Sequence, residues 1–283
     1  MQVLRILLAG ALPLTACSPT GGQPSKPPRP APPTPPPSAA PSARLSPAQG
    51  HAIGMKIWRN ESAGKVSGLT HWNEGEEFPS LGIGHFIWYP KGFNGRWTET
   101  FPEFIRFAQS RGVRDIPAAA LLPDCPWNSR AAFTRDFQGG SLTTLRKWLT
   151  ANVNLQTEFI MAKSRAALPK IMAAAPASQR PRIKANYDKV AATPNGTYAL
   201  IDYVNFKGDG TNPREQYKGQ GWGLMWVLLA MRDVAAGQAA AREFAISAKS
   251  RLDLRVRNSP PARGEKRWTA GWHNRCDTYA RPL

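Results

Sequence analysis

A glutamate and a short acidic run lie close together near the start of the region that is apolar enough to fold. Glu61 stands in the segment IWRNESAG, and Glu74, Glu76 and Glu77 follow in NEGEEF. Glycosidic bond cleavage typically uses one carboxylic acid to protonate the leaving oxygen, and a carboxylate to handle a water or the developing sugar cation. Glu61 follows the apolar residues of IW, whereas the acidic run reads as a wet turn. An acid in apolar surroundings keeps its proton more readily, so Glu61 is expected to be the acid.

A glycine-bearing run, SLGIGH, follows the acidic segment from Ser80 to His85. Together these residues resemble the signature of the phage-type lysozymes (muramidases) and the wider lysozyme superfamily. In that signature a helix ends in the catalytic glutamate, and an acidic residue on a hairpin lies six positions before a threonine that opens T-I-G-x-G-H. By position, the resemblance implies Glu61 as the general acid, Glu74 as the second carboxylate and Ser80 as a residue that holds the attacking water. It also implies a lysozyme-like fold and cleavage between N-acetylmuramic acid and N-acetylglucosamine.

This chain departs from the family pattern at the second acidic position. Glutamate replaces the usual aspartate, serine replaces threonine, and the gap between Glu61 and Glu74 is longer than usual. Glu76 or Glu77 therefore remains open as the second carboxylate. Without a second carboxylate, Glu61 alone would serve a lytic transglycosylase, in which the sugar's own 6-hydroxyl attacks the anomeric carbon. A peptidoglycan-binding lipoprotein without turnover is the alternative outside catalysis.

Several polar and aromatic residues are candidates for sugar contacts. Aromatic faces stack on sugar rings, and polar groups in glycine-rich loops can line a binding cleft. Core packing or internal hydrogen bonding is an equally ordinary use of such side chains, above all for the histidine. The candidates are His85, Trp88, Tyr89, Asn205, Tyr217, Gln220 and Trp222.

Other chemistries find little support in the sequence. His71, Glu74, Glu76 and His85 lie near one another but lack the spacing of a metal site, so we expect no metal and no cofactor. The GxSxG pattern of serine hydrolases is absent. The basic charge would suit nucleic acid as a partner, but an exported protein does not encounter nucleic acid, and the sequence has no recognised nucleic-acid-binding motif.

The amino terminus predicts export and lipidation. The segment MQVLRILLAGALPLTAC has one basic residue, Arg5, then an apolar run and small residues, which is typical of a signal peptide over residues 1–16. Its end, LTAC, resembles the bacterial lipobox and implies lipid modification of Cys17. Ser18 after that cysteine, rather than aspartate, implies anchoring in the bacterial outer membrane, facing the periplasm.

Residues 17–46 predict a linker, and the composition of the whole chain predicts a polyanionic partner. The linker segment is rich in proline and nearly devoid of core-forming residues, so it should be an extended tether. The chain carries a formal net charge of +18, with 37 Lys+Arg against 19 Asp+Glu. Peptidoglycan glycan strands fit both features as the partner, because the cell wall is polyanionic.

The two remaining cysteines, Cys125 and Cys276, predict a disulfide. An exported protein folds in an oxidising compartment, where two such thiols pair more often than they remain free. Two free buried thiols are the alternative.

The elements that must position these residues are mostly helical. Ser46 and Pro47 are typical of a helix start, and Gly64 of its end, which puts Glu61 in the last helical turn. Residues 66–89 predict a small antiparallel hairpin or meander. Further helices are expected near 100–112, 141–150, 155–174, 178–191, 197–206, 222–236 and 238–249. The sum is one mainly α (α+β) domain over residues 47–283.

Overall fold

The computed structural model of the chain describes residues 45–283. The expected signal peptide, the lipidated Cys17 and nearly all of the expected linker lie outside the described residues. Within residues 45–283, no helix is long and apolar enough to cross a membrane. The described part is mainly helical with a small antiparallel sheet, which confirms the predicted fold class at that level.

The first helix, α1 (Pro47–Ser62), begins and ends as its sequence predicts. The Ser46 hydroxyl accepts a hydrogen bond from the backbone N–H of Gln49, and the Gln49 side chain accepts one from the Ser46 N–H, forming a capping box. Ala63 adopts a left-handed conformation with φ 54° and ends the helix. Glu61 consequently lies in the last turn.

A three-stranded antiparallel sheet follows, as the sequence predicts for this region. Its strands run in the order β1 (Thr70–His71), β2 (Ser80–Leu81) and β3 (Phe86–Ile87). The turn between β2 and β3 packs against α5 (Val153–Ala174), where the side-chain oxygen of Gln156 accepts a 2.8 Å hydrogen bond from the N–H of Ile83. A Cβ on Gly82, whose φ is 74°, would lie 2.3 Å from the same oxygen, so this close approach requires glycine.

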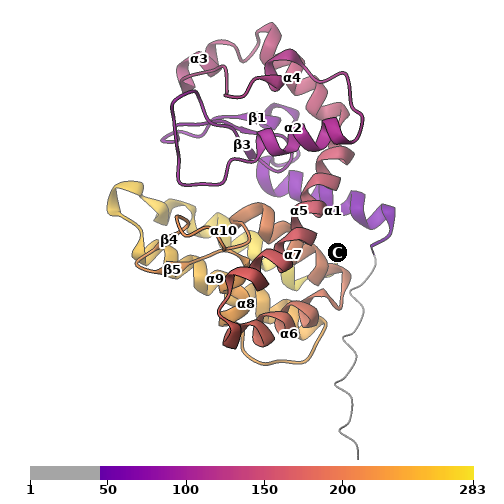
Figure 1. Ribbon diagram of the computed structural model, residues 1–283, viewed down its shortest axis with the longest axis vertical. Helices are drawn as coiled ribbons and strands as arrows, with labels where there is room; N and C mark the ends of the chain where they lie inside the picture. The colour runs from indigo at the N-terminus through magenta and orange to yellow at the C-terminus, as the bar shows by residue number, and fades with distance from the viewer. Residues whose placement is uncertain (1–44) are drawn as a thin grey trace, which may run out of the picture. The chain divides into compact units, whose positions relative to one another are not determined.

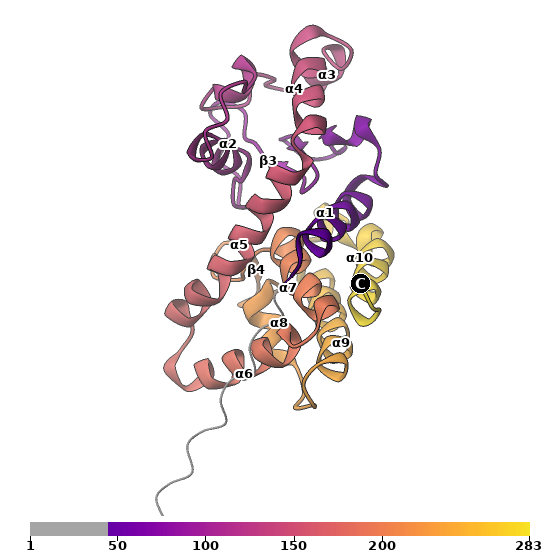
Figure 2. The same cartoon turned by 90° about the vertical axis from the view of Figure 1, so that its right-hand side faces the viewer.

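The helices form two groups around the cleft described below (Figures 1 and 2). We call the sheet with α2, α3 and α4 the N-terminal lobe, and α6 to α10 the C-terminal lobe; α1 and α5 run between them, and both contact α7. The remaining bounds are α2 (Phe101–Ser110), α3 (Arg130–Arg135), α4 (Gly140–Ala151), α6 (Arg180–Ala191), α7 (Pro194–Lys207), β4 (Gln216–Tyr217), β5 (Gln220–Gly221), α8 (Leu224–Ala230), α9 (Gln238–Asn258) and α10 (Thr269–Asp277).

Some local expectations were wrong. The expected helix near 222–236 ends at Ala230, and the chain turns before α9 begins. Thr100 precedes α2, and its hydroxyl accepts a hydrogen bond from the N–H of Ile87, which ties the helix start to β3. Glu103, in the first turn of α2, forms an ion pair with Lys163 of α5.

The disulfide expected between Cys125 and Cys276 is not formed, because both thiols are free and buried. The N–H of Cys125 donates to the carbonyl of Tyr89, and its thiol faces the carbonyl of Trp127 within the N-terminal lobe. Cys276 lies in α10 of the C-terminal lobe. A disulfide needs its two Cα atoms within about 7 Å, which their packing in separate lobes prevents.

Candidate active site

A cleft of about 990 Å³ lies between the two lobes. Its walls bring together residues that are far apart in the sequence, and its polar lining includes both ends of the predicted motif. Among the lining residues are Glu61 of α1, Ser80 of β2, His85, Asn205 of α7, Trp222 and Arg275 of α10. The structure therefore places Glu61 and three residues of the SLGIGH run, Ser80, Gly84 and His85, around one cavity.

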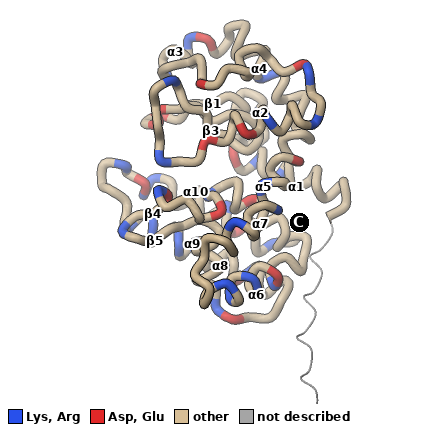
Figure 3. The backbone as a smooth tube through the Cα atoms, viewed as in Figure 1, with Lys and Arg blue, Asp and Glu red and all other residues tan. Residues whose placement is uncertain are grey.

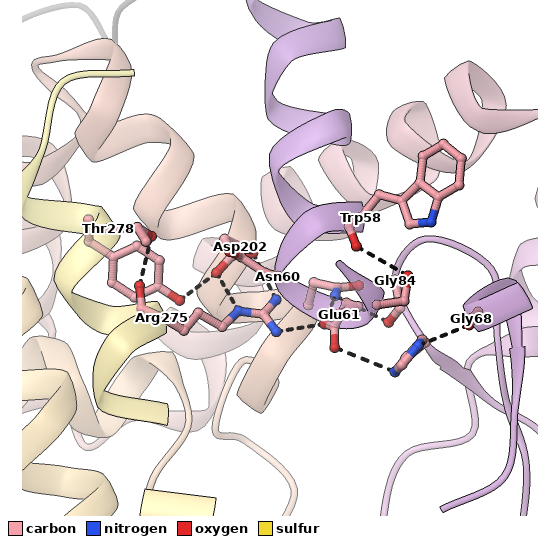
Figure 4. Close-up of polar contacts among 12 residues, drawn as sticks. Trp58, Asn60, Glu61, Gly68, Gly84, Asp202, Arg275 and Thr278 are labelled. Atoms are coloured by element: carbon pink, nitrogen blue, oxygen red, sulfur yellow. Dashed lines mark hydrogen bonds and ion pairs between the residues drawn. The ribbon is translucent and has the colours of Figure 1, made fainter. Parts of the chain in front are cut away.

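Glu61 is held from one side, at its Oε1 atom. The Arg275 guanidinium donates to Oε1 at 2.8 Å, and the Asn205 amide donates to the same oxygen at 3.1 Å. The other oxygen, Oε2, has only the Nδ1 atom of His85 nearby, at 3.6 Å (Figure 4). The two oxygens of Glu61 are thus different, because one is occupied by donors and the other is free of them.

His85 faces Glu61 as a neutral imidazole. Burial lowers the pKa of His85, although the Glu61 carboxylate opposes this effect. Its Nε2 atom lies 3.2 Å from the carbonyl oxygen of Gly68, which can only accept, so Nε2 carries the hydrogen. The Nδ1 atom is then unprotonated, and its lone pair points toward Glu61 Oε2. Oε2 is therefore the Glu61 oxygen that receives no hydrogen bond from His85.

A buried ion network fixes the group that holds Glu61. Arg275 donates two hydrogen bonds of 2.8 Å to Asp202, which is fully buried, and Tyr279 donates to the same carboxylate (Figure 4). Burial opposes the charge of Arg275, but Asp202 and Glu61 outweigh it and raise the pKa of Arg275 well above its ordinary value. Asn60 adds a long contact of 3.5 Å to Asp202. Arg275 is therefore a fixed cation that orients the Glu61 carboxyl group.

The acidic hairpin presents a different glutamate from the one expected. Glu74 is exposed and does not line the cleft, and Glu77 is also exposed. Glu76 does line the cleft; its carboxylate accepts a 3.0 Å hydrogen bond from the Asn73 amide. Burial raises the pKa of Glu76, and the Asn73 hydrogen bond only partly offsets this. Of the three candidates for a second carboxylate, the geometry favours Glu76 and not Glu74.

The predicted sugar-contacting residues divide into two groups. His85, Asn205 and Trp222 line the cleft, whereas Trp88, Tyr89, Tyr217 and Gln220 do not. Trp88 has no exposed surface and packs on Phe101 and Trp127. The hydroxyl of Tyr89 donates to the carbonyl of Trp97, that of Tyr217 donates to Glu265, and the side chain of Gln220 accepts from Arg251. These four serve packing and internal hydrogen bonding.

Two loops meet across the cleft, a feature the sequence did not reveal. We call this contact the lobe bridge; it comprises Arg96 and Thr98 from the N-terminal lobe and Asn212, Arg214 and Glu215 from the C-terminal lobe. Arg96 donates to the carbonyl oxygens of Arg214 and Gln216, and the N–H and hydroxyl of Thr98 each donate to Glu215 at 3.1 Å. Thr98, Asn212 and Glu215 also line the cavity. The bridge therefore restricts access to this part of the cleft.

The cleft combines a carboxyl group with one oxygen free of donors, a second carboxyl group on a hairpin, and a wall of aromatic and basic side chains. Within residues 45–283, no group of three or more His, Cys, Asp or Glu side chains is placed to hold a metal ion. No protein-family model, curated protein or solved structure matches this chain.

Proposed function

We propose that the chain is a lysozyme-like muramidase that hydrolyses the bond between N-acetylmuramic acid and N-acetylglucosamine in peptidoglycan. The observation that carries this proposal is the asymmetry of Glu61: Arg275 and Asn205 occupy Oε1, and the bare Nδ1 of His85 faces Oε2. This arrangement fixes the carboxyl group through Oε1 and leaves Oε2 as the oxygen that can present a proton to a substrate. General acid catalysis of glycoside cleavage requires such a proton at the leaving oxygen.

The proposed reaction uses the two carboxyl groups that line the cleft, those of Glu61 and Glu76. Glu61 Oε2 donates its proton to the glycosidic oxygen as the bond from that oxygen to the anomeric carbon breaks. Glu76 stabilises the positive charge on the sugar and accepts a proton from the water whose oxygen bonds to the anomeric carbon. Ser80, which is buried in β2 and lines the cleft, would hold that water. The products are a new reducing end and a new 4-hydroxyl group.

A lytic transglycosylase is the second candidate. It is favoured by the exposure of Glu74, the position at which the resemblance implies the second carboxylate. In that reaction the muramyl 6-hydroxyl attacks the anomeric carbon and gives its proton to the Glu61 carboxylate, so no water is consumed. The presence of Glu76 on the cleft wall makes hydrolysis the better supported of the two.

The cellular setting belongs to the same proposal. A lipid on Cys17 and a proline-rich tether would hold the domain at the outer membrane and let it reach the cell wall. The net charge of +18 suits a polyanionic wall as partner. In the described part, Lys and Arg occur in both lobes (Figure 3).

The direct test is the release of soluble fragments from dye-labelled sacculi by the wild type and by Glu61→Gln. Glu103→Gln is a matched control, because Glu103 also lines the cleft but pairs with Lys163. We expect release by the wild type and the control, and a loss of at least 100-fold in Glu61→Gln, in line with the contribution of general acid catalysis. If all three proteins bind sacculi and none of them releases fragments, the chain would be a non-catalytic peptidoglycan-binding protein.

A further inference from the structure

Lys207, the last residue of α7, places its amine on the cleft wall without a counter-ion among residues 45–283. Its ammonium nitrogen lies 3.9 Å from the ring centroid of Phe206 and 3.9 Å from that of Trp272, and it has no hydrogen bond or ion pair with any residue in 45–283. Two other lysines of the cleft differ in this respect. Lys163 pairs with Glu103, and Lys170 lies 4.0 Å from Asp209. A lysine placed in this way either loses its proton or takes an anionic partner from outside the chain.

The carboxylates near Lys207 are already engaged by arginines. Glu265 accepts two hydrogen bonds from Arg255, at 2.7 and 2.9 Å, and one from Arg263. Glu61 is engaged by Arg275. A positive charge on Lys207 would therefore find the nearby carboxylates already engaged. Figure 3 shows further Lys and Arg positions along α9 and beside α10.

The charge state of Lys207 reflects these surroundings. Burial lowers its pKa well below the ordinary value, and the guanidinium groups of Arg255 on α9 and Arg275 on α10 lower it further. Glu265 and Glu61 oppose this shift but do not cancel it. A bound anion would stabilise the charged form, so binding of an anion should take up a proton.

We propose that Lys207 and Trp272 form a subsite for a carboxylate of the peptidoglycan strand, adjacent to the bond that Glu61 cleaves. This inference rests on the proposed function. Lys207 lies one residue beyond Phe206 and two beyond Asn205, which donates to Glu61, so the subsite is close to the reacting centre. The aromatic rings confine the ammonium and leave it able to bind an anion from the cleft.

Peptidoglycan supplies such a carboxylate from two sources. The lactyl group of muramic acid is a free carboxylate only where the strand carries no stem peptide, because the peptide converts it into a neutral amide. Stem peptides carry carboxylates of their own. A subsite beside the scissile bond favours the lactyl source, and the enzyme would then prefer strands from which the peptides have been removed.

Calorimetric binding to full-length protein carrying Glu61→Gln tests the proposal, because this readout does not depend on turnover. The ligands are peptide-free glycan strands, peptide-bearing strands and uncharged oligomers of N-acetylglucosamine. The added variants are Lys207→Met, which keeps an unbranched apolar side chain between the rings, Lys207→Arg, which restores the charge, and Lys170→Met as a matched control on another lysine of the cleft.

We expect Lys207→Met to weaken binding of peptide-free strands about tenfold or more, the change given by one charge-assisted hydrogen bond. Lys207→Arg should recover most of the affinity, and Lys170→Met should change it little. Titrations in two buffers of different ionisation enthalpy should show proton uptake that Lys207→Met abolishes.

The three ligands separate the outcomes. A loss confined to peptide-free strands identifies the lactyl carboxylate, and a loss confined to peptide-bearing strands identifies a stem carboxylate. An equal loss for the uncharged oligomers, or no loss for any ligand, overturns the subsite. Failure of the proposed function is distinguishable, because it appears as an absence of cleavage by the wild type and leaves the binding results intact.

Discussion

Replacing Arg275 by alanine would leave two carboxylates of the site without their common partner. Arg275 is buried and makes three hydrogen bonds of 2.8 Å, two to Asp202 and one to Glu61. Removing one member of a buried ion pair costs about 3–5 kcal/mol, because the other charge stays buried and unpaired. Asp202 has no exposed surface, so in the native protein its charge is balanced from within the fold.

The expected loss of stability can be converted into a shift of the melting temperature. For a domain of this size, each kcal/mol shifts the melting temperature by about 2–4 °C, so Arg275→Ala should lower it by roughly 6–20 °C. Scanning calorimetry of the purified variant measures the shift. Asp202→Asn in the same background should recover part of the loss, because it removes the unpaired charge.

A clear result would refute this reasoning. If Arg275→Ala lowered the melting temperature by less than about 2 °C, the network would not be a buried, mutually dependent unit. Strict additivity of Arg275→Ala and Asp202→Asn would lead to the same conclusion. In either case the argument that Arg275 holds Glu61 in a fixed orientation would fail.

Three further predictions concern the rest of the site and its surroundings. Glu76 must be ionised to act and burial raises its pKa, so the acidic limb of the pH–rate profile should lie above the ordinary glutamate pKa of about 4.3. Glu76→Gln should abolish activity, and an unchanged pH–rate profile in that variant would exclude a catalytic role for Glu76. Burial raises the pKa of Cys125 and of Cys276 to about 12, so neither thiol should react with iodoacetamide at pH 8 until the protein unfolds, as peptide mass spectrometry can show. Arg96→Ala removes three hydrogen bonds from the lobe bridge and should speed hydrogen exchange at residues 94–98 and 212–216 while leaving α1 protected. Equal exchange in the wild type and in Arg96→Ala would mean that the lobe bridge does not hold the loops.

The parts of the fold that depend on local sequence were predictable. The helix that ends near Glu61 is fixed by a capping box and a left-handed terminus within a few residues of it. The short strands around Ser80 are marked by glycines and β-forming residues. In both cases the residues that determine the structure are neighbours in the sequence.

The contacts that define the site instead join residues that are far apart in the sequence. Arg275 is 214 positions from Glu61 and 73 from Asp202, and no local pattern links residues so far apart. The acidic hairpin was misjudged for a reason of geometry. Gly75 has a positive φ of 78°, which reverses the chain between Glu74 and Glu76, so only the latter faces the cleft.

The cysteines and the aromatic residues were misjudged because burial depends on the whole packing. The oxidising compartment expected for an exported protein favoured a disulfide, but the two thiols are free and lie in separate lobes. For Trp88 the sequence allows a sugar platform but slightly favours core packing, and its burial and its ring contacts with Phe101 and Trp127 agree with core packing.

Product analysis in ¹⁸O-labelled water tests the central claim, hydrolysis driven by Glu61, most directly. Sacculi would be digested by the wild type and by Glu61→Gln, and the fragments examined by mass spectrometry. The account predicts fragments that end in muramic acid with one ¹⁸O atom at the new reducing end, formed by the wild type and not by the variant. Fragments with an unlabelled 1,6-anhydro end, or the same fragments from both proteins, would contradict it.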